Sequence, residues 1–593
     1  MNSSFPVVQR SDINRSAISR IDEEIVQLEI RLISLRGVVL DGLHGRKIPN
    51  EIDQLQGRIL TCKSTRNALV PIAQLHDELL QDIFIAASRT WSGGQVALLV
   101  SWICRSWRKL AIQTSTLWSY INFDHPEWVQ TALSRTRDHE LEFSHSFLLE
   151  YPRKFDDQVP IWIENLHRIK GFTLTAFSMQ GMQGNFSLGP AWVTPAPCLV
   201  ELSLDRITLP PNIFSRTCHS LKSLRLTSCT FTWDSIPANP GMTNVSIEGP
   251  SVRVPVNNLM TKLRIIAPTL HELCLSDVLL PSPVMSSGFL EPRTPLQHAV
   301  LFKLAESHGD PVARLLDQIS LPELTNIIVE VSGGTLEDQI ATARALVGCR
   351  GLESWPVTYL KVDLDEDGVA FHMTEEWEEI IEGTEIVDET SVSLGLHLSG
   401  DHSKSSLLSA FNVLPLQPID ALRFEGDDSD HEAEHLEYFT GHTTVQWLEV
   451  SVTVVPAFVQ AIQRQNHQLR EIANIDGIPE VHLVLNEQTT ELGLEIMMFP
   501  QLQELCLDGN VFGERELGIG HYMELREWLV WRSIFGLRLF SLVLVKLRMP
   551  RGSVVWFDDL VDEFTQSGVE EVDEDPDASP FKVDLRFPPC IEA

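Results

Sequence analysis

The pattern in this sequence that most resembles a catalytic motif is His431-Glu432-x-x-His435. On a helix, two histidines four residues apart can bind Zn²⁺ while the glutamate acts as a general base. The neighbouring sequence does not favour this use, because residues 426–430 are polar and acidic and predict an exposed segment rather than an apolar cleft. We therefore expect a polar surface helix without a metal ion, and keep a zinc hydrolase as an alternative.

The cysteines and the remaining motifs also point away from an enzyme. The chain has nine cysteines and no C-x-x-C pair, which is typical of a reduced protein of the cytoplasm or the nucleus. It contains no phosphate-binding loop, no nucleophile elbow and no dinucleotide fingerprint. A secretory signal and an apolar run of about 20 residues are missing as well. We expect no catalytic residues, no cofactor and no membrane partner.

The charge of the chain is acidic and unevenly distributed. The 593 residues include 46 Lys and Arg against 81 Asp and Glu, a net charge of −35, yet residues 1–120 hold 14 basic and 11 acidic side chains. This balance excludes nucleic acid as the main partner, since that requires clustered Lys and Arg. Most of the acidic excess lies in residues 363–390, 425–434 and 558–577. We interpret these stretches as solvated loops, helix faces and a tail, or alternatively as steering for a basic partner.

Two heptad stripes near the amino end predict a pair of helices. The apolar positions are Ile18, Ile21, Ile25, Leu28, Leu32 and Leu35 in the first stripe, and Ile48, Ile52, Leu55, Ile59 and Cys62 in the second. Gly37 and residues 41–45 interrupt the pattern between them. Each stripe is shorter than three heptads, which favours an antiparallel hairpin within one chain. Dimerisation through the same stripes is the alternative.

The next 50 residues predict short helices with wide apolar faces. The first helix starts near Asp77, and the second follows a Ser-Gly-Gly turn at residues 92–94. Their apolar positions are Leu79, Leu80, Ile83, Phe84 and Ala87, and then Val100, Ile103, Cys104, Trp107 and Ala111. So small a domain cannot bury all of this surface, which predicts that part of it meets a partner.

This segment resembles an F-box. The resemblance lies in Leu75…Glu78-Leu79-Leu80…Ile83-Phe84, in Val100-Ser101-Trp102-Ile103-Cys104-Arg105-Ser106-Trp107-Arg108 and in Thr116-Leu117-Trp118. His76 departs from the family pattern, which has a proline there that presets the first helical turn. The resemblance implies docking on a Skp-type adaptor, and through it on a cullin, by apolar helix packing. The contacts it implies are Leu75, Leu79, Leu80, Ile83, Phe84 and Trp107, with Val100 and Cys104 in the F-box core.

Beyond residue 120 the pattern apolar-x-x-apolar-x-apolar recurs. Clear copies begin at Leu199, Leu221, Leu270, Leu324, Val445 and Leu502, and weaker copies at Ile169, Met242, Leu296 and Ile419. Alternate residues of each short strand would point into a core, and stacked copies would form a parallel sheet. Many intervals are about 20 to 30 residues, as in leucine-rich repeats. Because the interval from Val329 to Phe424 is far longer, an unrelated α/β domain is the alternative.

The residues between the apolar positions would face outward and form a surface for a target protein. They are Glu201, Ser203, Asp205, Ser223, Arg225, Thr227, Glu272, Ser276, Trp447, Glu449, Ser451, Glu504 and Asp508. As a set they lean acidic, which predicts a target with a basic segment.

The sequence thus predicts an α/β chain in four parts. These are a helical hairpin (1–70), a three-helix F-box (71–121), an irregular leucine-rich-repeat solenoid (122–550) and an acidic tail (551–593). The resemblance implies a non-catalytic substrate receptor of a Skp–cullin–F-box ubiquitin ligase, which holds its target near a ubiquitin-loaded conjugating enzyme. The alternative is a scaffold protein that acts outside a ligase.

Overall fold

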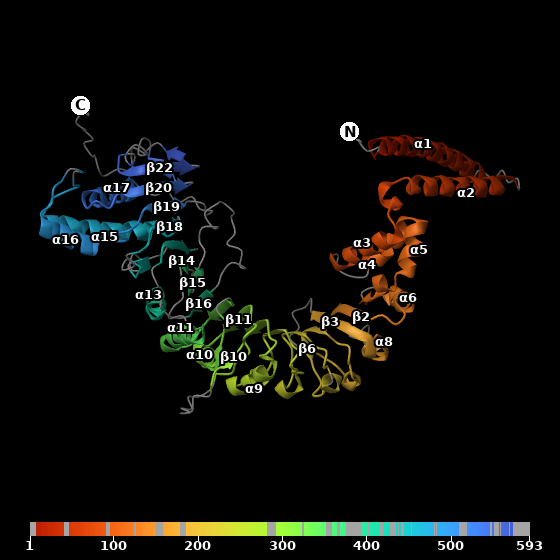
Figure 1. The fold of residues 1–593 in the computed structure, drawn as a ribbon, viewed down its shortest axis with the longest axis horizontal. Coiled ribbons are helices and arrows are strands. Elements are labelled where there is room, and N and C mark those ends of the chain that lie inside the picture. Colours follow the sequence, from red (N-terminus) through yellow and green to blue (C-terminus); the bar gives the residue numbers. More distant parts are fainter. Residues whose placement is uncertain are drawn as a thin grey trace, which may run out of the picture. The chain divides into compact units, whose positions relative to one another are not determined.

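The structure is a computed structural model of the chain (Figure 1). It describes residues 7–40, 47–90, 95–123, 126–148, 158–177, 185–216, 218–281, 292–322, 325–350, 358–364, 368–374, 394–400, 403–414, 419–426, 435–436, 438–439, 444–451, 453–479, 481, 483–508, 519–545, 548–550, 557, 559–567 and 570–572. The chain divides into two compact units, residues 1–223 with 234–237, and residues 224–233 with 238–593. None of the helices described combines the length and the apolar character needed to cross a bilayer.

Helices and short strands alternate along the described chain, and 17 of the strands belong to one large, mostly parallel sheet. This confirms the predicted α/β class. Alternation of side chains sets the layers, because each strand turns every second residue toward the helices and loops on one side.

The first unit begins with two long helices, α1 (Val7–Leu40) and α2 (Lys47–Ala68). Leu28 and Leu32 of α1 are buried against Leu55 and Ile59 of α2. The ion pairs that border this seam are Arg31–Glu51 (2.6 Å), Glu24–Arg58 (3.1 Å), Glu29–Lys63 (2.7 Å) and Asp22–Arg66 (2.8 Å). Early residues of α1 therefore face late residues of α2, as in an antiparallel hairpin, and the central stripe leucines are occupied within the chain.

One expectation for the hairpin is wrong, since α1 continues through Gly37 to Leu40. A glycine inside a helix costs about 1 kcal/mol relative to alanine, which neighbouring helical turns can absorb.

Five short helical elements follow the hairpin. They are η1 (Pro71–Gln74), α3 (Asp77–Thr90), α4 (Gln95–Ile103), α5 (Arg105–Gln113) and η2 (Ser115–Trp118). The predicted turn at residues 92–94 lies outside the described residues.

The sheet of the first unit contains β1 (Tyr120–Asn122), β2 (Leu141–Leu148), β3 (Ile169–Phe177) and β5 (Glu201–Asp205). These four strands pair in that order and all run parallel. The helices α6 (Pro126–Thr136) and α8 (Val159–Asn165) connect the first three. A short pair, β4 (Phe186–Ser187) with β6 (Ile207–Thr208), lies apart from this sheet. The core is aromatic, with Phe123 against Trp162 and Phe172 against Trp192 at ring-centroid distances of 5.2 and 5.0 Å.

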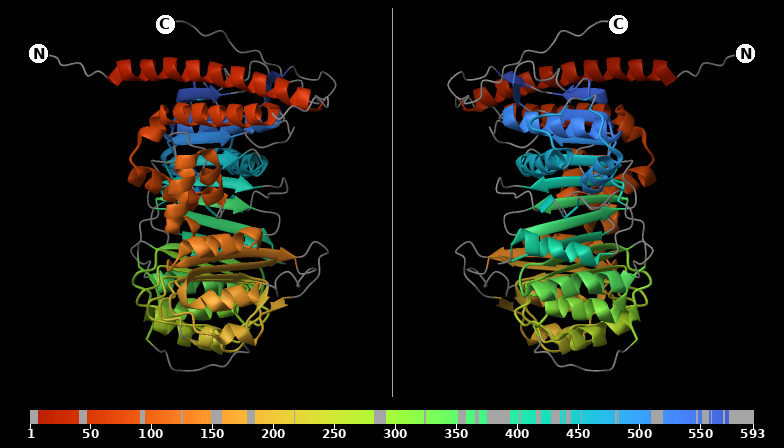
Figure 2. Two further views of the ribbon diagram at one scale, coloured as in Figure 1. Left: turned by 90° about the vertical axis from the view of Figure 1, so that its right-hand side faces the viewer. Right: turned by 90° about the vertical axis from the view of Figure 1, so that its left-hand side faces the viewer.

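The strands of the large sheet that follow β5 in the chain are β7 (Ser223–Thr227), β8 (Asn244–Glu248), β9 (Glu272–Ser276), β11 (Leu301–Glu306), β13 (Asn326–Val331), β14 (Tyr359–Leu364), β15 (Gly368–Thr374), β16 (Leu394–Ser399), β17 (Ala421–Gly426), β18 (Trp447–Ser451), β19 (Glu504–Asp508), β20 (Leu539–Val545) and β22 (Val561–Ser567). From β8 onward their order in the sheet is β8-β9-β11-β13-β16-β15-β14-β17-β18-β19-β20-β22. Figure 2 shows them as successive rungs.

Helices of the second unit lie along one side of these strands (Figure 1). They are α9 (Val256–Ile266), α10 (Gly309–Gln318), α11 (Leu336–Arg350), α13 (Lys404–Leu408), α15 (Val455–Ala473), α16 (Glu487–Ile496) and α17 (Ile519–Ile534). Two short strand pairs lie outside the large sheet in this part of the chain, β10 (Thr294–Pro295) with β12 (Ile319–Ser320) and β21 (Arg548–Pro550) with β23 (Glu570–Val572).

The structure differs from the predicted arrangement of repeats in two places. Strand β15 runs antiparallel to both β14 and β16, so the sheet is not wholly parallel as expected. The weak copy at Leu296 was also placed in the wrong register, because Leu301 is half-buried whereas Phe302 and Leu304 point into the core. A one-residue shift moves every side chain of a strand to the other face of the sheet.

Candidate functional site

The helix α3 begins where the sequence predicts, at Asp77. The carbonyl of His76 accepts the first helical hydrogen bond, from Leu80 N at 3.1 Å. Asp77 and Glu78 lie in the first turn, where their charge is favourable near the positive end of the helix dipole. His76 thus supports the helix start without the proline of the F-box pattern.

The second predicted helix is in fact two helices, α4 and α5, which meet at Cys104. Cys104 has an extended backbone and is the N-cap of α5, its sulfur accepting a hydrogen bond from Trp107 N at 3.5 Å. It is half-buried and is absent from the buried core, contrary to the expectation of a core thiol. The sequence conceals this break because Cys104 continues the helical spacing from Val100 to Trp107.

Two of the six predicted adaptor contacts, Leu80 and Phe84, are buried in this domain's own core. They lie one turn apart on the side of α3 that packs against Val100, Leu110 and Trp118. Neither side chain is available to a partner. That prediction is wrong for both residues, whereas Val100 is in the core as expected.

Trp107 is half-buried, and so is neither fully in the core nor fully at the surface. Its ring packs on Phe84 with centroids 4.9 Å apart. Trp107 therefore supports the core and has only part of its ring at the surface.

The remaining contacts, Leu75, Leu79 and Ile83, are exposed, Leu79 by 50 %. Helix α4 adds exposed apolar side chains that were not predicted as contacts. We call the two sets together the apolar surface, which consists of Leu75, Leu79, Ile83, Leu99, Trp102 and Ile103. Trp102 is 62 % exposed, a large apolar area to leave in water. The sequence carried a signal for Trp102, which is two residues from Val100 and therefore lies off the face that carries Val100. Ile103 belongs to the predicted stripe of Val100, so its exposure was not expected from the spacing.

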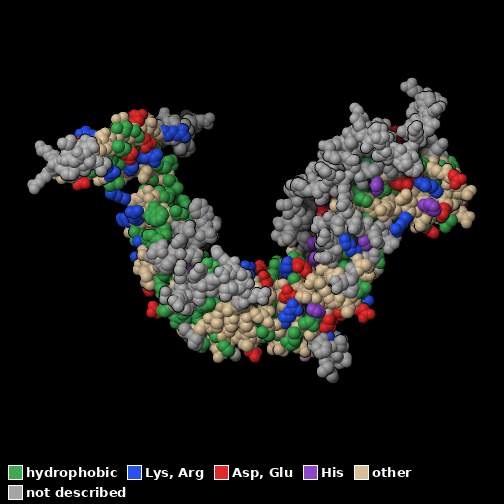
Figure 3. Space-filling model, turned by 180° about the vertical axis from the view of Figure 1, so that it is seen from behind, with side chains coloured by type: hydrophobic (Ala, Val, Ile, Leu, Met, Phe, Trp, Pro, Cys, Tyr) green, Lys and Arg blue, Asp and Glu red, His purple; other side chains and the backbone are tan. Residues whose placement is uncertain are grey.

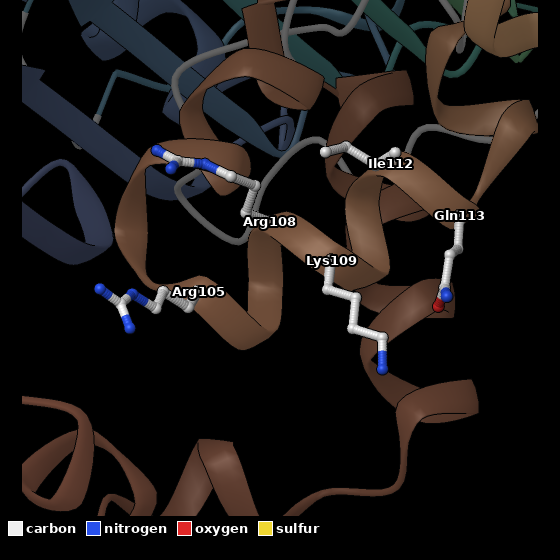
Figure 4. A pocket seen from close by; sticks show the side chains of 5 residues that line it. All are labelled: Arg105, Arg108, Lys109, Ile112 and Gln113. Atoms are coloured by element: carbon white, nitrogen blue, oxygen red, sulfur yellow. The ribbon is translucent and has the colours of Figure 1, made fainter. Parts of the chain in front are cut away.

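Helix α5 carries basic side chains beside the apolar side chain of Ile112. A shallow pocket of about 350 Å³ is lined by Arg105, Arg108, Lys109, Ile112 and Gln113 (Figure 4). Arg108 Nε donates to the carbonyl of Ser101 at 2.7 Å, which ties α5 to α4. In the space-filling view, hydrophobic and basic side chains lie beside each other on this part of the chain (Figure 3).

The second candidate site is the open face of the sheet, which carries the residues predicted to meet a target. On each of these strands the apolar residues that alternate with the predicted outward positions are buried, as are Leu505 and Leu507 of β19. The exposed positions are Glu201, Arg225 and Glu272, and the half-buried ones are Ser203, Asp205, Ser223, Thr227, Ser276, Trp447, Glu449, Glu504 and Asp508. Ser451 is buried, contrary to expectation.

The structure brings five of these residues together on two neighbouring strands. Glu449 is directly opposite Cys506, Trp447 is opposite Glu504, and Ser451 is opposite Asp508 across the β18–β19 pair. Glu201, Ser203 and Asp205 lie on β5, and Arg225 lies on β7, so the predicted set is spread over several strands.

Four charged residues and a tyrosine that were not predicted as part of a site lie on β14 and on β17, which pairs with β18. With Glu449 they form what we call the polar cluster, namely Tyr359, Lys361, Asp363, Arg423, Glu425 and Glu449. Lys361 Nζ is 3.0 Å from Asp363 and 2.6 Å from Glu425, and Arg423 Nη2 pairs with Glu425. The weak copy at Ile419 already indicated the outward direction of Arg423 and Glu425, whereas β14 follows no repeat signature.

The electrostatics of the polar cluster are uneven. Burial opposes the charge on Glu425, but Lys361 and Arg423 outweigh it and lower the pKa of this carboxyl. Burial raises the pKa of Glu449, and Asp508 and Glu425 add to the rise, while Arg423 opposes it. Glu425 is thus well compensated by cations and Glu449 is not.

Of the His-Glu-x-x-His motif, His431 and Glu432 lie outside the described residues. His435 is described and is buried, so it is not on an exposed helix face as expected. No group of three or more potential ligands is placed to hold a metal ion in the part of the chain that the structure describes.

Comparisons with known proteins give no family to which the chain can be assigned. No protein-family model matches the sequence, and the search of curated proteins finds no match.

Proposed function

We propose that this chain is a non-catalytic substrate receptor of a Skp–cullin–F-box ubiquitin ligase. Its helices α3–α5 would act as the F-box that docks on the Skp-type adaptor, and the open face of the sheet would bind the protein to be ubiquitinated. The observation that carries the proposal is the apolar surface, whose large side chains are left in water by a domain with a complete core of its own.

The F-box resemblance and the burial of individual residues support each other in this segment. Leu79 and Ile83 match the family pattern, and both are exposed on α3. Burying an exposed leucine or isoleucine side chain contributes about 1.5 to 3 kcal/mol. Three or four such side chains on one partner suffice for a specific complex, provided that they meet a groove of complementary shape.

The sheet supports the second half of the proposal. Its strands repeat a short apolar unit, as in leucine-rich repeats, and present successive polar residues on the open face. A target bound there would have its lysines held close to the conjugating enzyme, which raises their effective concentration.

A scaffold protein that binds the adaptor outside a ligase is the second candidate. The feature that favours it is His76, which replaces the proline that stiffens the first turn of α3. The two functions differ in one measurable way, since only a ligase subunit brings a cullin with the adaptor.

The test is co-purification of the adaptor and cullin with the full chain and with Leu79→Glu/Ile83→Glu. Both side chains are exposed, so the variant should fold while two charges replace the apolar contacts. We expect at least a tenfold loss of adaptor and cullin. The matched control is Ile33→Glu on α1, also an exposed isoleucine on a helix, which should retain both.

Unchanged adaptor recovery with the double variant would show that α3 is not the docking element. Adaptor without cullin, from the unchanged chain, would favour the scaffold.

A further inference from the structure

The charges of the polar cluster are not balanced across the sheet. Lys361 and Arg423 both converge on Glu425, and Lys361 also contacts Asp363. Within the described part of the chain, the ion pair of Glu449 is a longer one, 3.5 Å from its Oε2 to Arg423 Nη1. Its side chain is 12 % exposed, less than that of any other charged member of the cluster. Negative charge is therefore least compensated at the β18 side.

Further carboxylates lie beyond Glu449 on β19. Glu504 is opposite Trp447, and Asp508 is close enough to Glu449 to raise the pKa of its carboxyl. Among the residues that the structure describes on these four adjacent strands, Lys361 and Arg423 lie with Asp363, Glu425, Glu449 and Glu504, and the last two acidic residues lie on β18 and β19.

A buried polar atom without a partner marks the same place. Tyr359 is 2 % exposed, and its hydroxyl makes no hydrogen bond to any residue that the structure describes. Arg423, Glu449, Glu425 and Asp363 are its electrostatic neighbours, so the hydroxyl points among the charges of the cluster. Arg423 Nε likewise lacks a partner there. Buried polar groups in native proteins are satisfied by some partner in more than nine cases of ten.

Trp447 gives the site an apolar wall. It is half-buried on β18, two residues before Glu449, and the two side chains therefore share a face of the strand. A guanidinium group is the cation that stacks on an indole and pairs with a carboxylate at the same time.

We propose that the face formed by Trp447, Glu449 and Glu504 binds an arginine side chain of an extended basic segment. A peptide carbonyl of that segment would accept from Arg423 Nε after a small rotation of the side chain. The inference rests on the proposed function, in which this face meets the target, and it names the chemistry of that target.

The test measures binding of a fluorescently labelled twelve-residue peptide of alternating arginine and alanine to the full chain at 0.15 M salt. No adaptor is present, so the result does not depend on docking at α3. The variants are Glu449→Gln, Glu504→Gln and the matched control Glu330→Gln. Glu330 lies on β13, also on the open face, where it pairs with Lys303 at 3.1 Å. All three variants change the net charge equally, and diffuse attraction to an acidic protein would weaken equally in each.

We expect at least fivefold weaker binding for Glu449→Gln and for Glu504→Gln, and less than a twofold change for Glu330→Gln. Equal losses in all three variants, or no binding to the unchanged chain, would overturn the proposal. Thermal unfolding checks each variant, and Glu504→Gln decides the question if Glu449→Gln fails to fold. A specific peptide site in a chain that captures no adaptor would refute the ligase function alone.

Discussion

At the scale of single residues, Glu306 is a carboxyl group that the fold removes almost completely from water. It ends β11, where its Oε1 accepts hydrogen bonds from the backbone nitrogens of Val278 and Leu279 at 2.7 and 3.0 Å. Burial raises the pKa of Glu306 to about 7, although the two backbone donors oppose the rise. Nearby Asp277 adds to it, and Arg253 works against it. The ordinary pKa in the unfolded chain is about 4.5.

This pKa predicts a pH dependence of stability. Between about pH 4.5 and 7 the unfolded chain has released the proton of Glu306 and the folded chain retains it, so the free energy of unfolding falls as the pH rises. The contribution from this group is about 3 kcal/mol and levels off above pH 7. Glu306→Gln cannot ionise and should lack this part of the decline.

The measurement is denaturant unfolding of both proteins at pH 5 and pH 7.5. The free energy of unfolding of Glu306→Gln, minus that of the unchanged chain, should be more positive at pH 7.5 than at pH 5. A difference that is the same at both values would show that Glu306 ionises normally.

At the scale of elements, the sequence predicted what local spacing controls. Leu202 and Leu204 of β5 are buried because every second residue of a strand shares a face, a rule that needs no knowledge of the fold. Spacing does not tell which side of a helix has a neighbour, so Leu79 and Leu80 could not be distinguished before α4 and α5 were placed. The long interval before Phe424 contained β14–β16, whose antiparallel pairing needs no repeat unit and leaves no repeat signature.

The hairpin provides a second case in which spacing does not tell which side of a helix has a neighbour. Helix α1 carries apolar residues on two sides, and among the described residues only one side is covered, by α2. Leu28 is buried against α2, while Ile30 is 55 % exposed. Leu28→Ala should destabilise the hairpin by about 2 to 4 kcal/mol, through lost burial and the cavity left behind. Ile30→Ala should change it by less than about 0.5 kcal/mol.

Hydrogen exchange of the backbone amides of residues 14–37, followed by mass spectrometry, reports this difference directly. Exchange should accelerate strongly in Leu28→Ala and remain unchanged in Ile30→Ala. Similar acceleration in both would mean that the outer stripe is covered in solution by another chain.

At the scale of the whole molecule, the excess of acidic residues affects the stability of the fold through electrostatic repulsion. A net charge of −35 destabilises a compact chain through self-repulsion, since like charges are brought closer than in the unfolded state. Ion pairs such as Lys303–Glu330 offset part of this, but acidic residues outnumber basic ones by 81 to 46. Because few of the charged side chains that the structure describes are buried, dissolved salt can screen them.

The chain should therefore become more stable when salt is added at neutral pH. Raising sodium chloride from 0.01 to 0.3 M shortens the screening length from about 30 Å to less than 10 Å, which removes repulsion between distant carboxylates while close ion pairs lose less. We expect a rise of several degrees in the unfolding midpoint at pH 7.5, measured by scanning calorimetry. Near pH 4.9 the net charge approaches zero, and the same salt step should produce no rise, because only the favourable pairs remain to be screened. An equal rise at both pH values would attribute the effect to the salt's general action on apolar burial rather than to the acidity of this chain.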